Sequence, residues 1–232
     1  MRIKQIALIL FGLTLAVGQA QDNCSQYYPM EEGASFSYNM YDKKGNLEGT
    51  SVYKVREVST SGNETMAALN VSYEGNKKNE GFEMDYNFTC TGDGIRIDFN
   101  SLLPNQMLQQ YEDMDVEMDV TGTDIELPNN LSVGQELADA NVNVALKMSG
   151  IKMNIEAKTT NRKVVAKESV TTSAGTFECV VLTADISSKA MMAKVTLSDK
   201  LWLAKGVGIV KQETYNKKGK LESRMELASF NN

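Results

Sequence analysis

The chain has 232 residues, of which 42% are hydrophobic, with three cysteines, one tryptophan and no histidine. Without histidine this chain has no Ser-His-Asp or Cys-His relay and no imidazole metal ligand, and three thiols cannot form a four-cysteine zinc site. Acidic residues outnumber basic ones by 30 to 24, a net charge of −6, which disfavours binding to nucleic acids and to anionic membrane surfaces.

The first twenty residues, 1–20, predict a signal peptide. Arg2 and Lys4 precede an apolar run from Ile6 to Val17, and small residues follow up to Ala20, after which we expect cleavage. The remaining 22 basic and 30 acidic residues give residues 21–232 a net charge of −8. An apolar run of 12 residues is too short for a membrane-spanning helix, and no later run is longer, so we expect no transmembrane segment. The predicted destinations are the periplasm, the outer membrane or the extracellular space.

Alternating apolar and polar residues predict antiparallel strands along most of the chain. The clearest run, 82–90, places Phe82, Met84, Tyr86, Phe88 and Cys90 on one face, and the run 67–74 is its expected hairpin partner. Alternation resumes over 95–99, and the runs 142–148 and 151–155 predict another hairpin. The similar segments 41–48 and 215–222 predict two tight turns with shared turn chemistry.

Residues 103–111 depart from this pattern. Leu103, Met107, Leu108 and Tyr111 have helical spacing, and Pro104 suits a first turn, so a short helix is expected. With about ten strands elsewhere, the predicted fold is mainly β. It is one large curled antiparallel sheet or a partly closed barrel, and no linker divides it into further domains.

Export makes the three cysteines candidates for a disulfide. We predict a bond between Cys24 and Cys90, with Cys179 free, because this bond would tie the new N-terminus to the sheet. The alternative is three separately buried thiols.

Four acidic residues, Asp113, Asp115, Glu117 and Asp119, alternate with apolar ones. Alternate strand residues lie about 6.6 Å apart, a separation that also occurs between glycosidase carboxylates. Catalytic carboxylates usually face each other from different elements, however, and this row has no EF-hand glycine. We interpret the row as a solvated strand face, with a cation site and a hydrolase site as weaker alternatives.

Methionine is abundant, with 13 in the chain. Flexible thioethers suit a surface that fits varied apolar ligands, although methionine can also simply fill a core. Because a curled sheet must fill its concave side, we predict an apolar or lipid-like ligand there. Trp202 is expected mainly as a packing anchor. The predicted ligand-lining residues are Met84, Tyr86, Phe88, Met148, Met153 and Trp202.

Several stretches carry a family resemblance: 174–179, 202–211, 24–29, 101–104 and 127–134. Together they resemble the TapB-like proteins, exported proteins of Bacteroidetes with a domain of unknown function. The resemblance covers nearly all of the mature chain. It implies a β-rich exported domain related to the curled sheets of periplasmic lipoprotein carriers, with a remote link to type IV pili and no catalytic residues.

The sequence therefore favours a non-catalytic envelope protein, without cofactor or metal, that binds a lipid or another apolar small molecule. The rival hypothesis is an interaction or structural module of the envelope or of a surface appendage, which binds an envelope protein through an edge strand. A hydrolase that uses Asp115 or Glu117 is the third and weakest hypothesis.

Overall fold

The computed structural model describes residues 24–76, 81–99, 116–148, 151–190 and 193–231, and most of them form strands. The predicted signal peptide and the predicted helix at 103–111 lie outside these residues. Along the chain the strands are β1 (Ser35–Asp42), β2 (Leu47–Ser61), β3 (Glu64–Gly75), β4 (Gly81–Cys90), β5 (Gly94–Ile97), β6 (Val116–Thr123), β7 (Ile125–Pro128), β8 (Ala140–Met148), β9 (Ile151–Thr172), β10 (Gly175–Ala190), β11 (Ala193–Ala204), β12 (Gly208–Asn216) and β13 (Leu221–Asn231).

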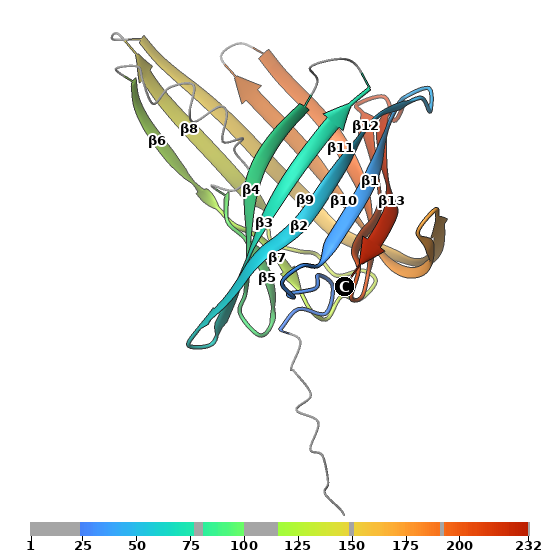
Figure 1. The fold of residues 1–232 in the computed structure, drawn as a ribbon. Helices are drawn as coiled ribbons and strands as arrows, with labels where there is room; N and C mark the ends of the chain where they lie inside the picture. The colour runs from blue at the N-terminus through green and yellow to red at the C-terminus, as the bar shows by residue number, and fades with distance from the viewer. Residues whose placement is uncertain (1–23, 77–80, 100–115, 149–150, 191–192, 232) are drawn as a thin grey trace, which may run out of the picture.

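The strands of the described residues form one 13-stranded sheet in the order β6-β8-β9-β10-β11-β12-β13-β1-β2-β3-β4-β5-β7. Every pairing is antiparallel, and Figure 1 shows the sheet curling into a nearly closed barrel shape. This confirms the predicted fold class of a mainly β chain with one large curled sheet. The expected number of strands, about ten, was too low, partly because β5 and β7 have only 4 residues each.

The two edge strands of the sheet, β6 and β7, are consecutive in the chain. Thr123 ends β6 and Ile125 begins β7, so the chain passes from one edge of the sheet to the other at Asp124. The Asp124 carboxylate accepts a hydrogen bond from the Phe99 backbone N–H at 3.1 Å and lies 3.3 Å from the Arg96 guanidinium. The curled sheet is therefore tied together at this residue.

Away from Asp124, the two edges of the curled sheet do not pair with each other among the described residues. β5 pairs with β4 only at Phe88–Cys90, so among the described strands none lies beside this edge of β4 from residue 81 to residue 86. The outer edge of β6 is likewise unpaired there. Two free strand edges therefore flank the opening.

Most predicted hairpins are present. β3 and β4 pair from Thr65–Cys90 to Glu74–Gly81, and β8 and β9 pair from Ala140–Thr159 to Met148–Ile151. The two similar turns also share their chemistry. Asp42 accepts hydrogen bonds from the N–H groups of Lys44 and Asn46, both at 2.8 Å. The Asn216 side chain accepts the equivalent bonds in the β12–β13 turn.

The longest strands, β9 with 22 residues and β10 with 16, bend at two irregularities. Their register shifts between Val181 and Leu182 and again between Thr183 and Asp185. Opposite the second shift, Asn161 has a φ of 52°, in the left-handed region. Such bulges bend a strand and change the face on which the following side chains lie.

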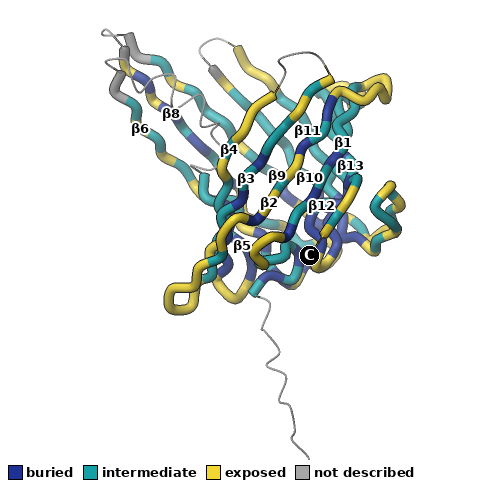
Figure 2. Tube along the Cα trace, viewed as in Figure 1, coloured by how far each residue is buried: buried dark blue, intermediate teal, exposed yellow. Residues whose placement is uncertain are grey.

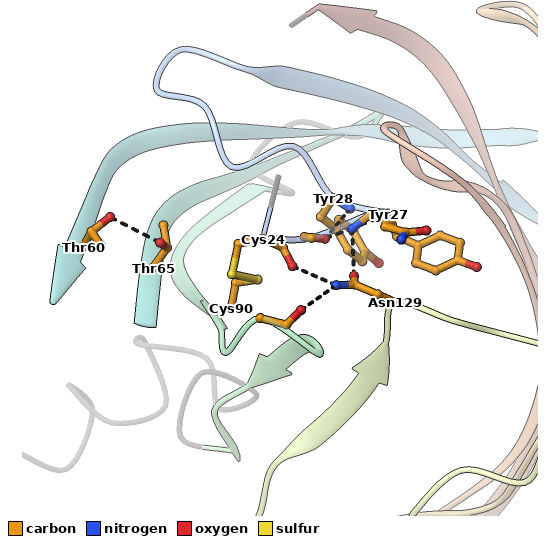
Figure 3. Close-up of a disulfide and its surroundings, with 10 residues drawn as sticks. Cys24, Tyr27, Tyr28, Thr60, Thr65, Cys90 and Asn129 are labelled. Atoms are coloured by element: carbon orange, nitrogen blue, oxygen red, sulfur yellow. Dashed lines mark hydrogen bonds between the residues drawn. A yellow bond between two sulfur atoms is a disulfide. The ribbon is translucent and has the colours of Figure 1, made fainter. Parts of the chain in front are cut away.

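The N-terminal segment lies at one end of the curled sheet (Figure 1), and Figure 3 shows the disulfide and the hydrogen bonds that hold it there. The predicted disulfide is confirmed: Cys24 and Cys90 are bonded, with 5.8 Å between their Cα atoms, and Cys179 is free and buried. The Asn129 amide donates to the Cys24 carbonyl at 2.9 Å and accepts from the Gln26 N–H at 2.8 Å. The segment that carries Tyr27 and Tyr28 is therefore held against the end of the sheet.

Buried residues gather in the half of the sheet next to this segment, while the hairpin tips are exposed (Figure 2). Gly208 shows how tightly the segment packs, because a Cβ at this position would lie 2.8 Å from the Tyr28 ring. Its φ of 86° also favours glycine. Among the described residues, no helix is long and apolar enough to cross a membrane.

Candidate functional site

A cavity of about 320 Å³ lies inside the curled sheet, above Tyr28 of the N-terminal segment. Its wall includes side chains from both halves of the sheet, and most of them are aliphatic or aromatic. The volume is at the lower end of the range typical for small-molecule sites. The lining residues are Tyr28, Phe36, Tyr38, Tyr53, Leu69, Val71, Met84, Tyr86, Phe88, Ile97, Ile125, Leu127, Thr159, Arg162, Leu182, Thr183, Ala184, Ile186, Asp199, Leu201, Leu203, Ile209 and Gln212.

Three of the six residues predicted to contact a ligand line this cavity. Met84, Tyr86 and Phe88 alternate along β4, so all three face inward. Tyr28 packs against Phe88 with 4.8 Å between ring centroids, and Tyr86 meets Phe88 edge-on at 5.3 Å. Their contact with a ligand stays a prediction.

The other three predicted residues lie elsewhere. Trp202 is 4% exposed and packs with Cys179 and Val181, whereas its neighbour Leu203 lines the cavity. Met153, on β9, packs against Val142, Val144 and Leu146 of β8. Met148 belongs to β8, but its side chain lies outside the described residues.

Four tyrosines line one side of the cavity: Tyr28, Tyr38, Tyr53 and Tyr86. Burial raises the pKa of each hydroxyl, so all four remain neutral donors at physiological pH. Within the part of the chain that the structure describes, none of these hydroxyls has a hydrogen-bond partner. The cavity therefore offers polar groups as well as apolar surface.

Among the described residues that line the cavity, Arg162 is the one cationic side chain, and it is 6% exposed. Its guanidinium donates to the backbone carbonyl of Ala138 at 2.7 Å and to that of Glu126 at 2.8 Å. Burial lowers the pKa of Arg162, partly offset by Asp139 and Glu126, but a guanidinium stays charged at physiological pH. A buried positive charge therefore borders the cavity.

Asp199 is the one acidic side chain in the described part of the lining. Its Oδ2 accepts a hydrogen bond from the Gln212 amide at 2.5 Å, while its buried Oδ1 has no partner. Burial raises the pKa of the Asp199 carboxyl, although hydrogen bonds from Thr214 and Gln212 act in the opposite direction. Asp199 lies on β11 and Arg162 on β9, two strands or about 10 Å apart, so they form no ion pair.

The sequence analysis missed Arg162, Asp199 and Gln212. For Asp199 a signal was present, because it occupies an inward position in the alternation of Leu197, Leu201 and Leu203. A charged residue at a position where the alternation is otherwise apolar indicates a polar group on the inner face of the sheet. For Arg162 no such signal exists, because the bulge at Asn161 shifts the phase of β9.

The acidic row gives no evidence for a metal or catalytic site. Asp113 and Asp115 lie outside the described residues, as does the side chain of Glu117. Asp119 is exposed on β6, in agreement with a solvated strand face. In the described ranges, no three histidine, cysteine, aspartate or glutamate side chains cluster closely enough to hold a metal ion.

A family profile matches residues 31–227, which include all of the cavity lining except Tyr28. The chain belongs to the DUF3108-like family. The TapB-like name suggested by the sequence motifs is not the name of this profile. No curated protein matches the chain.

Two solved structures share the fold of this DUF3108-like chain. One is a putative exported protein with a YmcC-like fold from Bacteroides fragilis, with 21% identity and a TM-score of 0.68, covering 90% of this chain and 100% of its own. The other is a putative lipoprotein from Parabacteroides distasonis, with 23% identity and a TM-score of 0.69, covering 89% and 99%. At these identities the likeness establishes the fold alone.

Proposed function

We propose that this DUF3108-like chain is an exported, non-catalytic protein of the cell envelope that binds an apolar or amphiphilic small molecule inside its curled sheet. The observation that carries the proposal is the cavity of about 320 Å³, with its mainly aliphatic and aromatic lining. Well-packed protein interiors leave few voids larger than a water molecule, so a space of this size needs an occupant or a function.

Several features support export. The predicted leader at 1–20 has the charged, apolar and small-residue regions of a signal peptide. A disulfide such as Cys24–Cys90 persists in oxidising compartments. The two structural neighbours are described as exported and as a lipoprotein.

Fluorescence of 1-N-phenylnaphthylamine tests the binding proposal, because this dye brightens in apolar sites. We expect saturable binding to the wild-type protein purified after export. Ala184 lines the cavity, and the Ala184→Phe substitution places a ring inside it, so this variant should bind the dye at least about tenfold more weakly.

The matched control is Ala193→Phe, which adds the same ring at an exposed position near the start of β11 and should bind like the wild type. Native mass spectrometry provides an independent measurement, with co-purified lipid expected on the wild-type protein. A wild-type protein that neither binds the dye nor carries a small molecule contradicts the proposal. Unchanged dye binding by a folded Ala184→Phe variant does so as well.

The free strand edges support a second candidate function, an interaction module of the envelope or of a surface appendage such as a pilus. An extended peptide can pair with the edge of β4 at residues 81–86 or with the outer edge of β6, because no described strand lies beside either edge. A stable complex with another envelope protein, together with an absence of dye binding, would favour this candidate.

A further inference from the structure

Arg162 faces the cavity because of a local irregularity in β9. Thr159 and Val164 both lie on the inner side of the sheet, opposite Ile186 and Leu182 of β10. They are five residues apart, which strict alternation would place on opposite faces. The bulge at Asn161 adds one residue to β9, so Thr159 and Val164 can both face inward. Arg162 then shares the inward face with Val164.

The guanidinium has hydrogen bonds but no counter-ion. Both of its bonds end on neutral backbone carbonyls, those of Ala138 and Glu126. Among the described residues no carboxylate lies within 4.0 Å of it, although Lys158 and Lys163, close by in β9, both form ion pairs. A guanidinium has five N–H donors, so three of them remain for another acceptor.

A buried charge without a counter-ion is unfavourable, and an anion beside it removes much of that cost. Asp139 and Glu126 lie close enough to favour the charged form, but neither carboxylate contacts the guanidinium. Asp139 instead accepts a hydrogen bond from the Asn161 N–H at 3.1 Å. Asp199 lies two strands away and is engaged by Gln212.

The rest of the lining matches an amphiphile. The partnerless hydroxyls of Tyr28, Tyr38, Tyr53 and Tyr86 are neutral donors for the oxygen atoms of an anion. The aliphatic side chains, such as Leu69 and Leu201, provide apolar contacts for a hydrocarbon chain. The net charge of −8 expected after cleavage disfavours binding of anions elsewhere on the protein.

We propose that the cavity binds an amphiphile with an anionic head group, a carboxylate or a phosphate, and that Arg162 is its counter-ion. This inference rests on the proposed function, since it names the class of ligand for the same cavity. A fatty acid and a single-chain phosphate ester are the two sources of such a head group.

The test measures displacement of 1-N-phenylnaphthylamine by three ligands with the same chain: laurate, dodecyl phosphate and dodecanol. We expect at least one of the two anions to bind the wild-type protein about tenfold or more tightly than the neutral alcohol, because charge-assisted hydrogen bonds are stronger than neutral ones. A preference for laurate or for dodecyl phosphate identifies the head group.

The variant Arg162→Gln keeps hydrogen-bond donors but removes the charge. It should bind the anions only as tightly as dodecanol, while its affinity for dodecanol stays within about threefold of the wild-type value. Arg162→Lys keeps the charge without the planar fork and should fall between the two. Lys163→Gln is the matched control, because it removes a positive charge at the next residue, whose side chain is exposed, and should retain the preference for anions.

Three results would overturn the inference. The wild-type protein could bind dodecanol as tightly as both anions, a comparison that requires no variant to fold. A folded Arg162→Gln could keep the preference for anions. It could also lose all three ligands equally, which would show a purely structural role in joining β9 to β7. In each case the wild-type protein would still bind the dye, whereas failure of the proposed function removes dye binding by the wild-type protein itself.

Discussion

The two faces of β11 show how differently one strand can use its buried side chains. Trp202 and Leu203 are adjacent and both buried, at 4% and 1% exposure, yet they point to opposite sides of the sheet. Leu203 borders the cavity, whereas Trp202 lies in a cluster with Cys179 and Val181. Burial by itself therefore does not distinguish a packing residue from a site residue.

On the Trp202 face, the side chain of Trp202 makes several polar contacts. The indole N–H donates to the Glu168 carboxylate at 3.1 Å and holds the pKa of that carboxyl below its usual value. The ammonium groups of Lys200 and Lys211 lie 4.4 and 4.8 Å from the ring centroid. The far end of β9 contributes Val170 to this cluster. In the turn that follows β9, the Ser173 hydroxyl donates to the Ala228 carbonyl of β13 at 3.3 Å.

The cavity face keeps polar groups that lack such partners. Arg162 has no counter-ion, the Asp199 Oδ1 accepts no hydrogen bond, and four tyrosine hydroxyls have no partner among the described residues. Folding alone does not favour such an arrangement, because buried polar groups in proteins are usually paired. The combination of empty volume and incomplete pairing supports the proposal that a ligand binds on the inner face.

The largest expected effect comes from Trp202→Ala, on the packed face. Removing a buried tryptophan leaves a cavity and should lower the free energy of unfolding by about 3–5 kcal/mol. The measurement is urea denaturation of the variant and the wild type. Dye binding per folded molecule should not change, because Trp202 does not line the cavity. Loss of dye binding by a variant that is still folded would contradict the division between the two faces.

Opening the disulfide should have a slightly smaller effect, in this case on the cavity side. The bond joins residues 66 positions apart, and the chain-entropy account assigns a loop of this size about 4 kcal/mol. The double variant Cys24→Ser, Cys90→Ser should lose that much stability and also bind the dye more weakly, because Tyr28 follows Cys24 and lines the cavity.

Cys179→Ser is the control for these substitutions, because the Cys179 thiol is free and does not line the cavity.

Alkylation of the native protein tests the disulfide directly. Burial raises the pKa of the Cys179 thiol to about 11, so alkylation at pH 8 should be slow. It should label no other cysteine among the described residues, because Cys24 and Cys90 are bonded to each other. Rapid labelling of two or three cysteines would contradict the disulfide.

Local patterns in the sequence were sufficient to predict many of the strands and several hairpins. Alternation over 82–90 depends only on which face is buried, and the Asp42 and Asn216 turns depend on hydrogen bonds within a few residues. The same alternation correctly placed Met84, Tyr86 and Phe88 on one face. It could not show whether Trp202 faces the cavity or the packed cluster, because β11 is covered on both sides.

Other features depend on contacts between distant residues. The pairing of β6 with β8 and of β7 with β5 places consecutive strands on opposite edges of the sheet, which only the curl of the whole sheet makes possible. The inward direction of Arg162 depends on a bulge at Asn161. The sequence does not predict this bulge, because asparagine is common in many other contexts. Asp199 was accessible to sequence analysis, as a carboxylate in the inward phase of β11.

That carboxylate leads to the smallest of the predicted effects, which depends on pH. Burial raises the folded-state pKa of Asp199 above its unfolded value, so the folded protein binds this proton more tightly than the unfolded chain does. The stabilisation is complete below the unfolded pKa and is lost as pH rises through the folded pKa. At neutral pH the ionised carboxylate, with its partnerless Oδ1, should therefore lower the stability of the fold.

Asp199→Asn cannot ionise and should be more stable than the wild type by about 1 kcal/mol at pH 7, a gain that shrinks on acidification. Melting temperatures of both proteins between pH 3 and pH 8 measure this difference, with the exposed Asp119→Asn as control for loss of a charge. An Asp199→Asn variant that is less stable than the wild type at pH 7 would show that the ionised carboxylate is fully solvated or paired, and that the cavity wall is less desolvated than its lining indicates.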